Sequence, residues 1–243
     1  MNNIKQEFER EALVLGEDAV IKLNNSSVAL FGVGGVGSYA AEALARAGVG
    51  RIMLVDSDTV SRSNVNRQLC ALQSTIGRFK VDVVAERIRD INPDAIVDCR
   101  RDFVLPDNIE SFELENFDFV IDAIDTVSAK IAIIETSLAL GTPSVSCMGT
   151  GNKLDPTAFC VTDISKTNTC PLARVMRREL KKRGISHARV IYSTEEAMTP
   201  KETLSDGNKR SVPGSLSFVP SVAGLIAASE AVRSILKGEK KNG

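Results

Sequence analysis

The segment from Val28 to Ser38 constrains the fold more than any other part of this 243-residue chain. A short apolar run, 28–31, leads into Gly32-Val33-Gly34-Gly35-Val36-Gly37, and an alanine-rich helix is expected from about 38 to 47. Such a unit gathers unpaired N–H groups and the positive end of a helix dipole at one point, where a phosphate can bind. The alternative is a tight turn that binds nothing. The flanking strand and helix favour a nucleotide site.

A second predicted strand, 51–55, ends at Asp56, about 20 residues after the glycines, where a carboxylate can bind ribose hydroxyls. Up to this point an NAD-dependent dehydrogenase and an ATP-using enzyme look alike. The polar stretch that follows carries Arg67, and the segment that ends in Lys80 leads into a predicted helix, 81–91. These two cations suit a triphosphate that must be neutralised and held in line. Each cation taken singly is also typical of a solvated surface.

Two aspartates, Asp122 and Asp125, lie at and just after the apolar end of another predicted strand, 117–122. Such a strand is expected in the middle of a parallel sheet, and ligands bind at the carboxyl edge of such sheets. Mg²⁺ needs only one or two carboxylates when phosphates complete its coordination, so Asp125 is the candidate metal residue. The alternative for Asp122 or Asp125 is to cap the helix expected to start near residue 128.

Strand-like and helix-like segments alternate along the chain, which predicts an α/β fold with a doubly wound, mostly parallel, Rossmann-like sheet. The predicted strands lie near 27–31, 51–55, 95–100, 117–122, 143–147, 158–163 and 189–193. The predicted helices lie near 38–47, 78–91, 128–140, 171–183 and 221–236. We expect a single domain, 1–243, in which a less regular basic lobe at about 162–215 carries the substrate specificity.

A net charge of −1 and 43% hydrophobic residues are typical of a globular chain with one large core. The polar N-terminus predicts no signal peptide, and we expect no apolar run long enough to span a membrane. The most apolar stretch, 219–236, is interrupted by Glu230 and Arg233 and predicts a buried helix.

Five cysteines without paired spacing predict a reducing, cytoplasmic location and no structural zinc. Cys170 precedes Pro171 in a predicted loop and is the best candidate for a nucleophile if that loop is exposed, but nothing near it in the sequence would activate its thiolate.

A basic cluster lies between Lys166 and Arg189, where eight Lys or Arg residues face a single acid, Glu179. A polyanionic partner is favoured because each neutralised phosphate releases a counterion. Aromatic side chains are sparse here, so backbone contacts to a folded RNA are favoured over base stacking. The alternative is a solvated helix face. The predicted RNA contacts are Arg174, Arg177, Arg178, Lys181, Lys182 and Arg183.

Five motifs, in order, resemble the adenylating core of the ubiquitin-activating-enzyme-like superfamily, which includes the adenylyltransferases of thiamine and molybdopterin synthesis. They are the glycine loop, Val55-Asp56-x-Asp58-x-Val60, Ser63-Asn64-x-Asn66-Arg67-Gln68, Gly77-x-x-Lys80 and Ile91-Asn92-Pro93. The resemblance implies an ATP site lined by Gly32, Gly34, Gly35 and Gly37, with Asp56 at the ribose and with Asn64, Arg67, Gln68 and Lys80 around the phosphates. It also implies that Asp125 is associated with Mg²⁺, and that Arg10 reaches the neighbouring subunit's ATP in a homodimer.

The segments 169–185, 192–195 and 214–220 extend the resemblance to nearly the whole chain, and they are similar to the tRNA threonylcarbamoyladenosine dehydratase family. This implies ATP-dependent cyclisation of the threonylcarbamoyl group on tRNA through an acyl-adenylate. The implied catalytic residues are Arg67, Lys80, Asp125 and Arg10. A sulfur-transfer protein remains open as a further partner.

Three alternatives belong to other functional classes. An adenylyltransferase for a ubiquitin-like sulfur carrier often has paired-cysteine zinc motifs, which this sequence lacks. An NAD-dependent oxidoreductase has no need of Arg67 and Lys80 at this position. A purely structural tRNA-binding protein leaves the ATP motifs unexplained.

Overall fold

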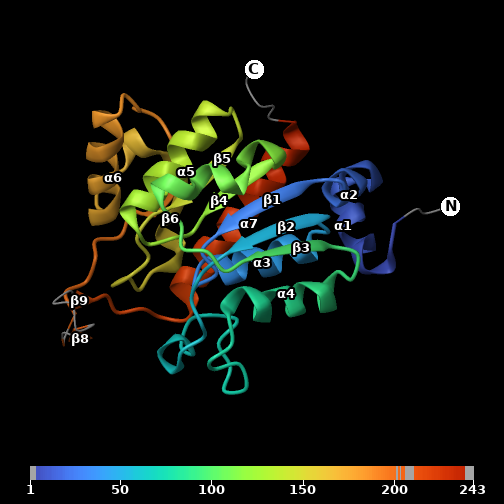
Figure 1. Cartoon of the computed structure of the whole chain (residues 1–243), viewed down its shortest axis with the longest axis horizontal. Coiled ribbons are helices and arrows are strands. Elements are labelled where there is room, and N and C mark those ends of the chain that lie inside the picture. Colours follow the sequence, from blue (N-terminus) through green and yellow to red (C-terminus); the bar gives the residue numbers. More distant parts are fainter. Residues whose placement is uncertain (1–3, 201, 203, 206–210, 239–243) are drawn as a thin grey trace.

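A computed structural model describes residues 4–200, 202, 204–205 and 211–238. In this part of the chain seven strands form one sheet in the order β3-β2-β1-β4-β5-β7-β6 (Figure 1). The strands are β1 (Ser27–Phe31), β2 (Arg51–Val55), β3 (Ile96–Arg100), β4 (Phe119–Asp122), β5 (Ser144–Cys147), β6 (Phe159–Asp163) and β7 (Arg189–Ser193). Neighbouring strands are parallel except β6 and β7, which confirms the predicted doubly wound, mostly parallel fold.

The strand order reverses between β1 and β4. The chain runs outwards from β1 to β3 and then returns to place β4 on the other side of β1, with Phe31 paired to Asp122. The loops that leave β1 and β4 therefore diverge to opposite faces of the sheet. Open α/β sheets bind ligands in the crevice that such a reversal leaves at the carboxyl ends of the strands.

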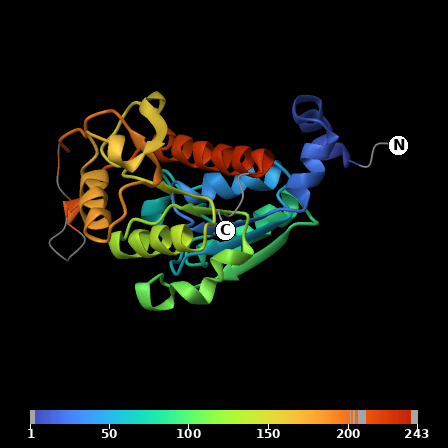
Figure 2. The same cartoon turned by 90° about the horizontal axis from the view of Figure 1, so that it is seen from above.

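Helices cover both faces of the sheet (Figure 2). The helices α3 (Gly37–Arg46), α4 (Lys80–Ile91) and α7 (Phe218–Lys237) share one hydrophobic core with the sheet. On the other face, α5 (Val127–Ala139) packs with the 3₁₀ segment η3 (Pro106–Phe112), and α6 (Pro171–Lys182) forms a further cluster with α5 and β7. The short 3₁₀ turns are η1 (Gln6–Phe8), η2 (Arg62–Asn64), η4 (Leu114–Asn116), η5 (Pro156–Ala158) and η6 (Ile164–Lys166).

Helix α7 occupies the interior predicted for the apolar stretch 219–236. By length and composition it could cross a membrane, so the expectation that no run is long enough was wrong. It packs instead against α3. At Gly224 the two helices approach so closely that a Cβ atom would lie 2.2 Å from the Val36 carbonyl oxygen.

Two N-terminal helices, α1 (Glu9–Leu15) and α2 (Glu17–Asn24), were not predicted. They extend from the end of the sheet opposite α6 (Figure 1). Phe8 is buried beside Gly48 and anchors this region, whereas α1 itself buries no side chain and leaves Leu13 and Val14 more than 80% exposed. A helix without a buried face has no apolar periodicity by which to find it in the sequence.

The basic lobe predicted at 162–215 contains regular elements. It contains α6, strand β7, which lies next to the edge strand β6, and a two-stranded ribbon of β8 (Leu204–Ser205) and β9 (Ser211–Val212). Residues 201, 203 and 206–210 of this lobe lie outside the described residues. Its boundaries and its role in specificity remain predictions.

Candidate functional site

The glycine loop leaves β1 in a conformation that few residues other than glycine adopt. Gly32 has φ of +85°, and a Cβ atom there would lie 2.6 Å from the Ala123 carbonyl oxygen. The Gly32 N–H donates to the Val55 carbonyl at 2.8 Å. Among the described residues no acceptor takes the N–H groups of Gly34 and Gly35. The loop therefore presents free backbone donors at the start of α3, as an anion site requires.

Gly37 is the first residue of α3. It is buried and does not line the cavity described below, because it packs behind the loop. A Cβ atom at Gly37 would lie 1.7 Å from the carbonyl oxygen of Gly32. Its function is to let α3 begin directly against the turn.

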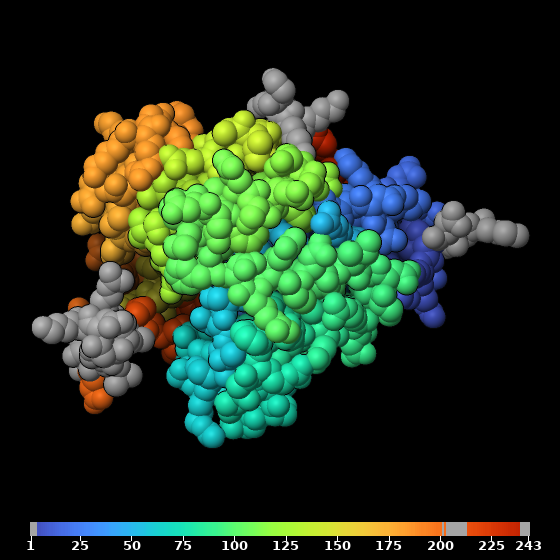
Figure 3. Space-filling view, viewed as in Figure 1, coloured from blue at the N-terminus to red at the C-terminus, as the bar shows by residue number. Residues whose placement is uncertain are grey.

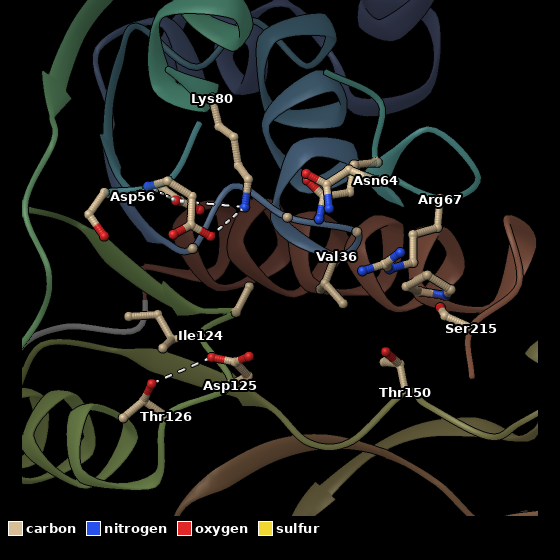
Figure 4. A pocket seen from close by; sticks show the side chains of 18 of the residues that line it. Val36, Asp56, Asn64, Arg67, Lys80, Ile124, Asp125, Thr126, Thr150 and Ser215 are labelled. Atoms are coloured by element: carbon tan, nitrogen blue, oxygen red, sulfur yellow. Dashed lines mark hydrogen bonds and ion pairs between the residues drawn. The ribbon is translucent and has the colours of Figure 1, made fainter. Parts of the chain in front are cut away.

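A cavity of about 580 Å³ opens at the carboxyl edge of β1, β2 and β4 (Figure 4). It is large enough for a nucleotide-sized ligand. The predicted site residues that line it are Gly32, Gly34, Gly35, Asp56, Asn64, Arg67, Gln68, Lys80 and Asp125. The fold thus brings residues from five separate segments of the chain to one cavity.

Asp56 and Lys80 form the electrostatic centre of one wall. The Asp56 carboxylate accepts hydrogen bonds from the N–H groups of Val33 at 2.7 Å and Asp58 at 2.9 Å. Burial raises the pKa of Asp56 above its usual value, and Lys80 and the two N–H groups partly offset that shift. The Lys80 ammonium lies 2.7 Å from Asp58 Oδ2 and 3.9 Å from Asp56 Oδ1. Asp56 therefore both holds the glycine loop and presents a carboxylate to the cavity.

Arg67 is held by neutral acceptors. Its Nη1 atom donates to the Ser63 carbonyl and to Asn66 Oδ1, both at 2.9 Å. No carboxylate in the described part of the chain lies within ion-pair distance of it. Figure 4 shows its guanidinium pointing across the cavity above Ser215. An uncompensated guanidinium in a cavity is a binding element for an anion such as phosphate.

Asn64 and Gln68 belong to the turn that carries Arg67. Asn64 Oδ1 accepts from the Ser61 N–H at 2.9 Å and so fixes η2. Gln68 is buried, and its amide nitrogen is the nearest side-chain atom to Gly34. Both side chains border the space in front of the glycine loop.

Asp125 lies on the cavity wall opposite Lys80 and Arg67 (Figure 4). Its side chain is exposed, and within the described residues it accepts one hydrogen bond, a 3.5 Å contact from Thr126 Oγ1. Neither Asp122 nor Asp125 caps α5, whose N-cap residue is Thr126 without a side-chain bond, so the capping alternative was wrong. In the described residues no three His, Cys, Asp or Glu side chains gather for a metal. A magnesium ion at Asp125 would need phosphate oxygens as its other ligands.

Arg10 does not reach this cavity within one chain. It lies on α1 and borders a separate, smaller hollow with Leu13 and Glu17. Figure 1 places α1 at the far end of the sheet from the cavity edge. A role for Arg10 at an ATP site therefore requires a second copy of the chain.

The predicted RNA-binding cations lie on α6, at one edge of the molecular surface (the orange region of Figure 3). Glu179 pairs with Arg178, Lys182 and Arg183, so more of these charges are compensated than the sequence suggested. Arg177 donates to the carbonyl and hydroxyl oxygens of Thr167. Arg174 and Lys181 are exposed, and no ion pair involves them in the described residues.

The sequence prediction missed the far wall of the cavity, formed by Thr150, Gly151 and the segment 213–215. The Gly149-Thr150-Gly151 run follows β5 and could have been placed at the carboxyl edge of the sheet by the same rule as Asp125. The segment 213–215 carried no such signal. Asn66 holds it through a 2.9 Å hydrogen bond to the Ser215 carbonyl, across 149 residues of sequence.

The thiols are poor candidates for nucleophiles. Cys170 is 1% exposed and lies beside Gly149, so its side chain lacks the exposure that a nucleophile would need. Burial raises the pKa of Cys70 to about 11 and that of Cys147 to about 12. The thiolate form of these two residues is therefore scarce near neutral pH.

The model of one protein family, described as the ThiF family, matches residues 8–242. This chain belongs to the ThiF family. It is 46% identical over 241 residues to the tRNA threonylcarbamoyladenosine dehydratase of Bacillus subtilis, covering 95% of each chain. The Escherichia coli enzyme TcdA in complex with ATP has 36% identity and a TM-score of 0.88, covering 98% of this chain and 97% of that one. The adenylyltransferase and sulfurtransferase uba4 of Aspergillus niger is 34% identical over 141 residues, which cover 57% of this chain and 29% of its own.

Proposed function

We propose that this chain catalyses the ATP-dependent dehydration of threonylcarbamoyladenosine in tRNA. The observation that carries the proposal is the full-length similarity to threonylcarbamoyladenosine dehydratases, joined to a cavity that offers free loop N–H groups, Arg67 and Lys80 to a triphosphate. The similarity spans 95% of this chain and 95% of the Bacillus subtilis enzyme, so it includes nearly all of that enzyme rather than one shared module.

The chemistry follows from the poor electrophilicity of a carboxylate. An oxygen of the threonyl carboxylate attacks the α-phosphorus of ATP, the bond to the β-phosphate oxygen breaks, and pyrophosphate leaves. The neighbouring carbamoyl group then attacks the activated carbonyl carbon, and AMP leaves with the carboxylate oxygen. The nucleoside loses one water in total. The second step is intramolecular and needs positioning more than an enzyme nucleophile, which agrees with the burial of Cys70, Cys147 and Cys170.

The residues that line the two walls of the cavity have different roles in this reaction. Lys80 and Arg67 neutralise the phosphates, and the N–H groups of Gly34 and Gly35 bind their oxygens. Asp56 accepts from the ribose. Asp125 is the residue that would hold Mg²⁺, which would supply charge stabilisation for the departing pyrophosphate. A carboxylate exposed to the cavity and nearly free of hydrogen bonds suits that role.

The alternative, activation of a sulfur carrier, draws less support. The similarity to the uba4 protein covers 57% of this chain and 29% of that protein, whereas the similarity to the Bacillus subtilis dehydratase covers 95% of each chain.

The decisive experiment incubates the purified protein with Mg²⁺, ATP and tRNA that carries threonylcarbamoyladenosine. Gentle digestion and mass spectrometry of the nucleosides should show the loss of one water that depends on ATP, with one AMP formed per event. A matched reaction without ATP is the control. An unchanged nucleoside with no AMP would reject the dehydratase, and AMP formation only on adding a sulfur carrier would establish the alternative.

The assembly and location belong to the same proposal. We propose a homodimer in which Arg10 of one subunit completes the ATP site of the other, because α1 leaves its apolar side chains exposed and Arg10 outside its own cavity. All five cysteines are free thiols, which supports a reducing compartment such as the cytoplasm.

The tRNA surface is proposed to be α6. The helix begins beside Gly149, one residue before Thr150 of the cavity wall, so an RNA backbone lying along α6 can deliver a nucleoside to the cavity. Replacing the exposed cations Arg174, Arg178 and Lys181 with glutamine should reduce the slope of log affinity against log salt by about 0.9 for each phosphate that the protein no longer neutralises. Filter binding of tRNA at several salt concentrations measures that slope.

A variant of equal charge tests whether α6 is special. Replacement of Lys22, Arg89 and Arg233 with glutamine removes three exposed cations from α2, α4 and α7. This variant should keep the wild-type slope. Equal slopes for the two triple variants would show that tRNA does not bind along α6.

A further inference from the structure

A buried polar network lies beneath the loop that carries Asp125. Asp122, Lys130 and Ser146 are each no more than 2% exposed. Asp122 Oδ2 accepts hydrogen bonds from Lys130 Nζ at 3.0 Å and from Ser146 Oγ at 2.5 Å, and Lys130 Nζ lies 3.3 Å from Ser146 Oγ. The register pairs Asp122 on β4 with Ser146 on β5, so the sheet itself brings the two side chains together.

Stability alone is a poor reason for this network. Removing two ions from water is costly, and replacing a buried ion pair by apolar residues of similar volume is often neutral or stabilising. What an apolar pair cannot supply is a set of directional hydrogen bonds. The structure shows where one of those bonds leads.

The second oxygen of Asp122 holds the backbone of the turn from 123 to 125. Asp122 Oδ1 accepts from the Ile124 N–H at 3.1 Å. On the other side of the turn, the Ala123 N–H donates to the Phe31 carbonyl at 2.7 Å, next to the glycine loop. Asp125 has almost no side-chain contacts of its own, so its position is set by this backbone.

Lys130 connects the network to α5. Its own N–H donates to the Thr126 carbonyl at 3.0 Å in the first turn of the helix. Its side chain returns to Asp122 at the end of β4, so the start of α5, the end of β4 and the turn between them form one closed unit.

We propose that Lys130 and Asp122 are positioning residues that fix Asp125 against the ATP phosphates. The inference rests on the proposed function of Asp125 at the Mg²⁺–ATP complex. Neither side chain lines the cavity, and each acts through the backbone from 123 to 125. Ser146 restricts the rotation of the Asp122 carboxylate and contributes less.

The test compares three variants in ATP binding without tRNA, measured by calorimetry at graded Mg²⁺ concentrations. In Lys130→Met the Mg²⁺ concentration that gives half of the full ATP affinity should rise by about 10- to 100-fold, as for other groups that orient metal ligands. ATP binding without Mg²⁺ should stay unchanged. The double variant Asp122→Leu with Lys130→Met removes both charges and the acceptor of the Ile124 N–H at similar side-chain volume, and it should show the same increase.

Lys153→Met is the matched control. Lys153 is also buried, 4% exposed, but its ammonium donates to the Glu195 carbonyl rather than to Asp122. This variant should keep the wild-type Mg²⁺ dependence. If Lys130→Met does not fold, the charge-neutral double variant decides the question. Folded protein with wild-type Mg²⁺ dependence in that variant would overturn the proposal.

This test distinguishes a failure of the positioning role from a failure of the proposed dehydratase activity. If the wild-type protein does not dehydrate tRNA but the Lys130 variants still raise the Mg²⁺ requirement of ATP binding, only the proposed reaction fails. If the wild-type protein dehydrates tRNA and the variants match its Mg²⁺ dependence, only the positioning role fails.

Discussion

Replacement of Lys80 with alanine is expected to lower the rate of pyrophosphate release by about 10²- to 10³-fold, the usual cost of losing one preorganised charge donor. Lys80 is 5% exposed and its ammonium is fixed between Asp56 and Asp58 at the cavity wall. A charge held in place in this way needs no reorganisation when the phosphates gain negative charge. Pyrophosphate formed per enzyme with saturating modified tRNA measures the effect.

Asp58→Asn is the control for the ion pair. It removes the 2.7 Å partner of Lys80 but leaves the ammonium in the cavity. We expect a loss of less than about ten-fold, since the Asp58 side chain is 67% exposed and such pairs are weak. A Lys80→Ala enzyme as active as Asp58→Asn would show that Lys80 serves only to hold the loop.

The same variant tests the shared site. In a symmetric dimer that donates Arg10 across its interface, an equal mixture of Lys80→Ala and Arg10→Ala chains forms half mixed dimers, each with one intact site. The mixture, after dissociation and reassembly, should recover about a quarter of the wild-type rate. Two inactive variants that recover nothing when mixed would show that Arg10 does not complete the partner's site.

Much of this architecture could be predicted because the signals are local. The strands near Val28, Arg51 and Val120 are short apolar runs next to glycine or polar turns, and parallel strands place their carboxyl ends at one edge. That rule alone brings Asp56, Lys80 and Asp125 towards one cavity. The role of Gly37 could not be derived in the same way, because it depends on an atom of Gly32 that only the folded turn positions.

Other features depend on contacts between distant segments. The wall at 213–215 is held by Asn66, and no periodicity links two residues 149 apart. Cys170 was placed in a predicted loop because Pro171 follows it, but the side chain turns inward against Gly149. The buried Asp122–Lys130 ion pair could not be predicted from the sequence either, because a lysine at the start of a helix usually faces solvent.

Gly37→Ala is expected to have the largest effect on the folded protein. Its Cβ would lie 1.7 Å from the Gly32 carbonyl oxygen, far inside van der Waals contact. Gly32 cannot retreat, because it is itself packed against the Ala123 carbonyl and has φ of +85°. Either the turn or the start of α3 must move. We expect a loss of about 3 kcal/mol or more in the free energy of unfolding, measured by urea denaturation.

Gly34→Ala separates this steric role from the binding role of the loop. A Cβ at Gly34 meets its nearest neighbour, Gln68 Nε2, at an ordinary 3.6 Å, so the variant should fold with a change of less than about 1 kcal/mol. Because Gly34 lines the cavity, its added methyl group should weaken ATP binding while stability is kept. The Gly37 variant should thus lose stability, whereas the Gly34 variant should lose ATP affinity. If both variants were equally stable, the turn would be able to shift to make room for the added methyl group. The tight packing of Gly32 between Gly37 and Ala123 would then not determine the shape of the phosphate site.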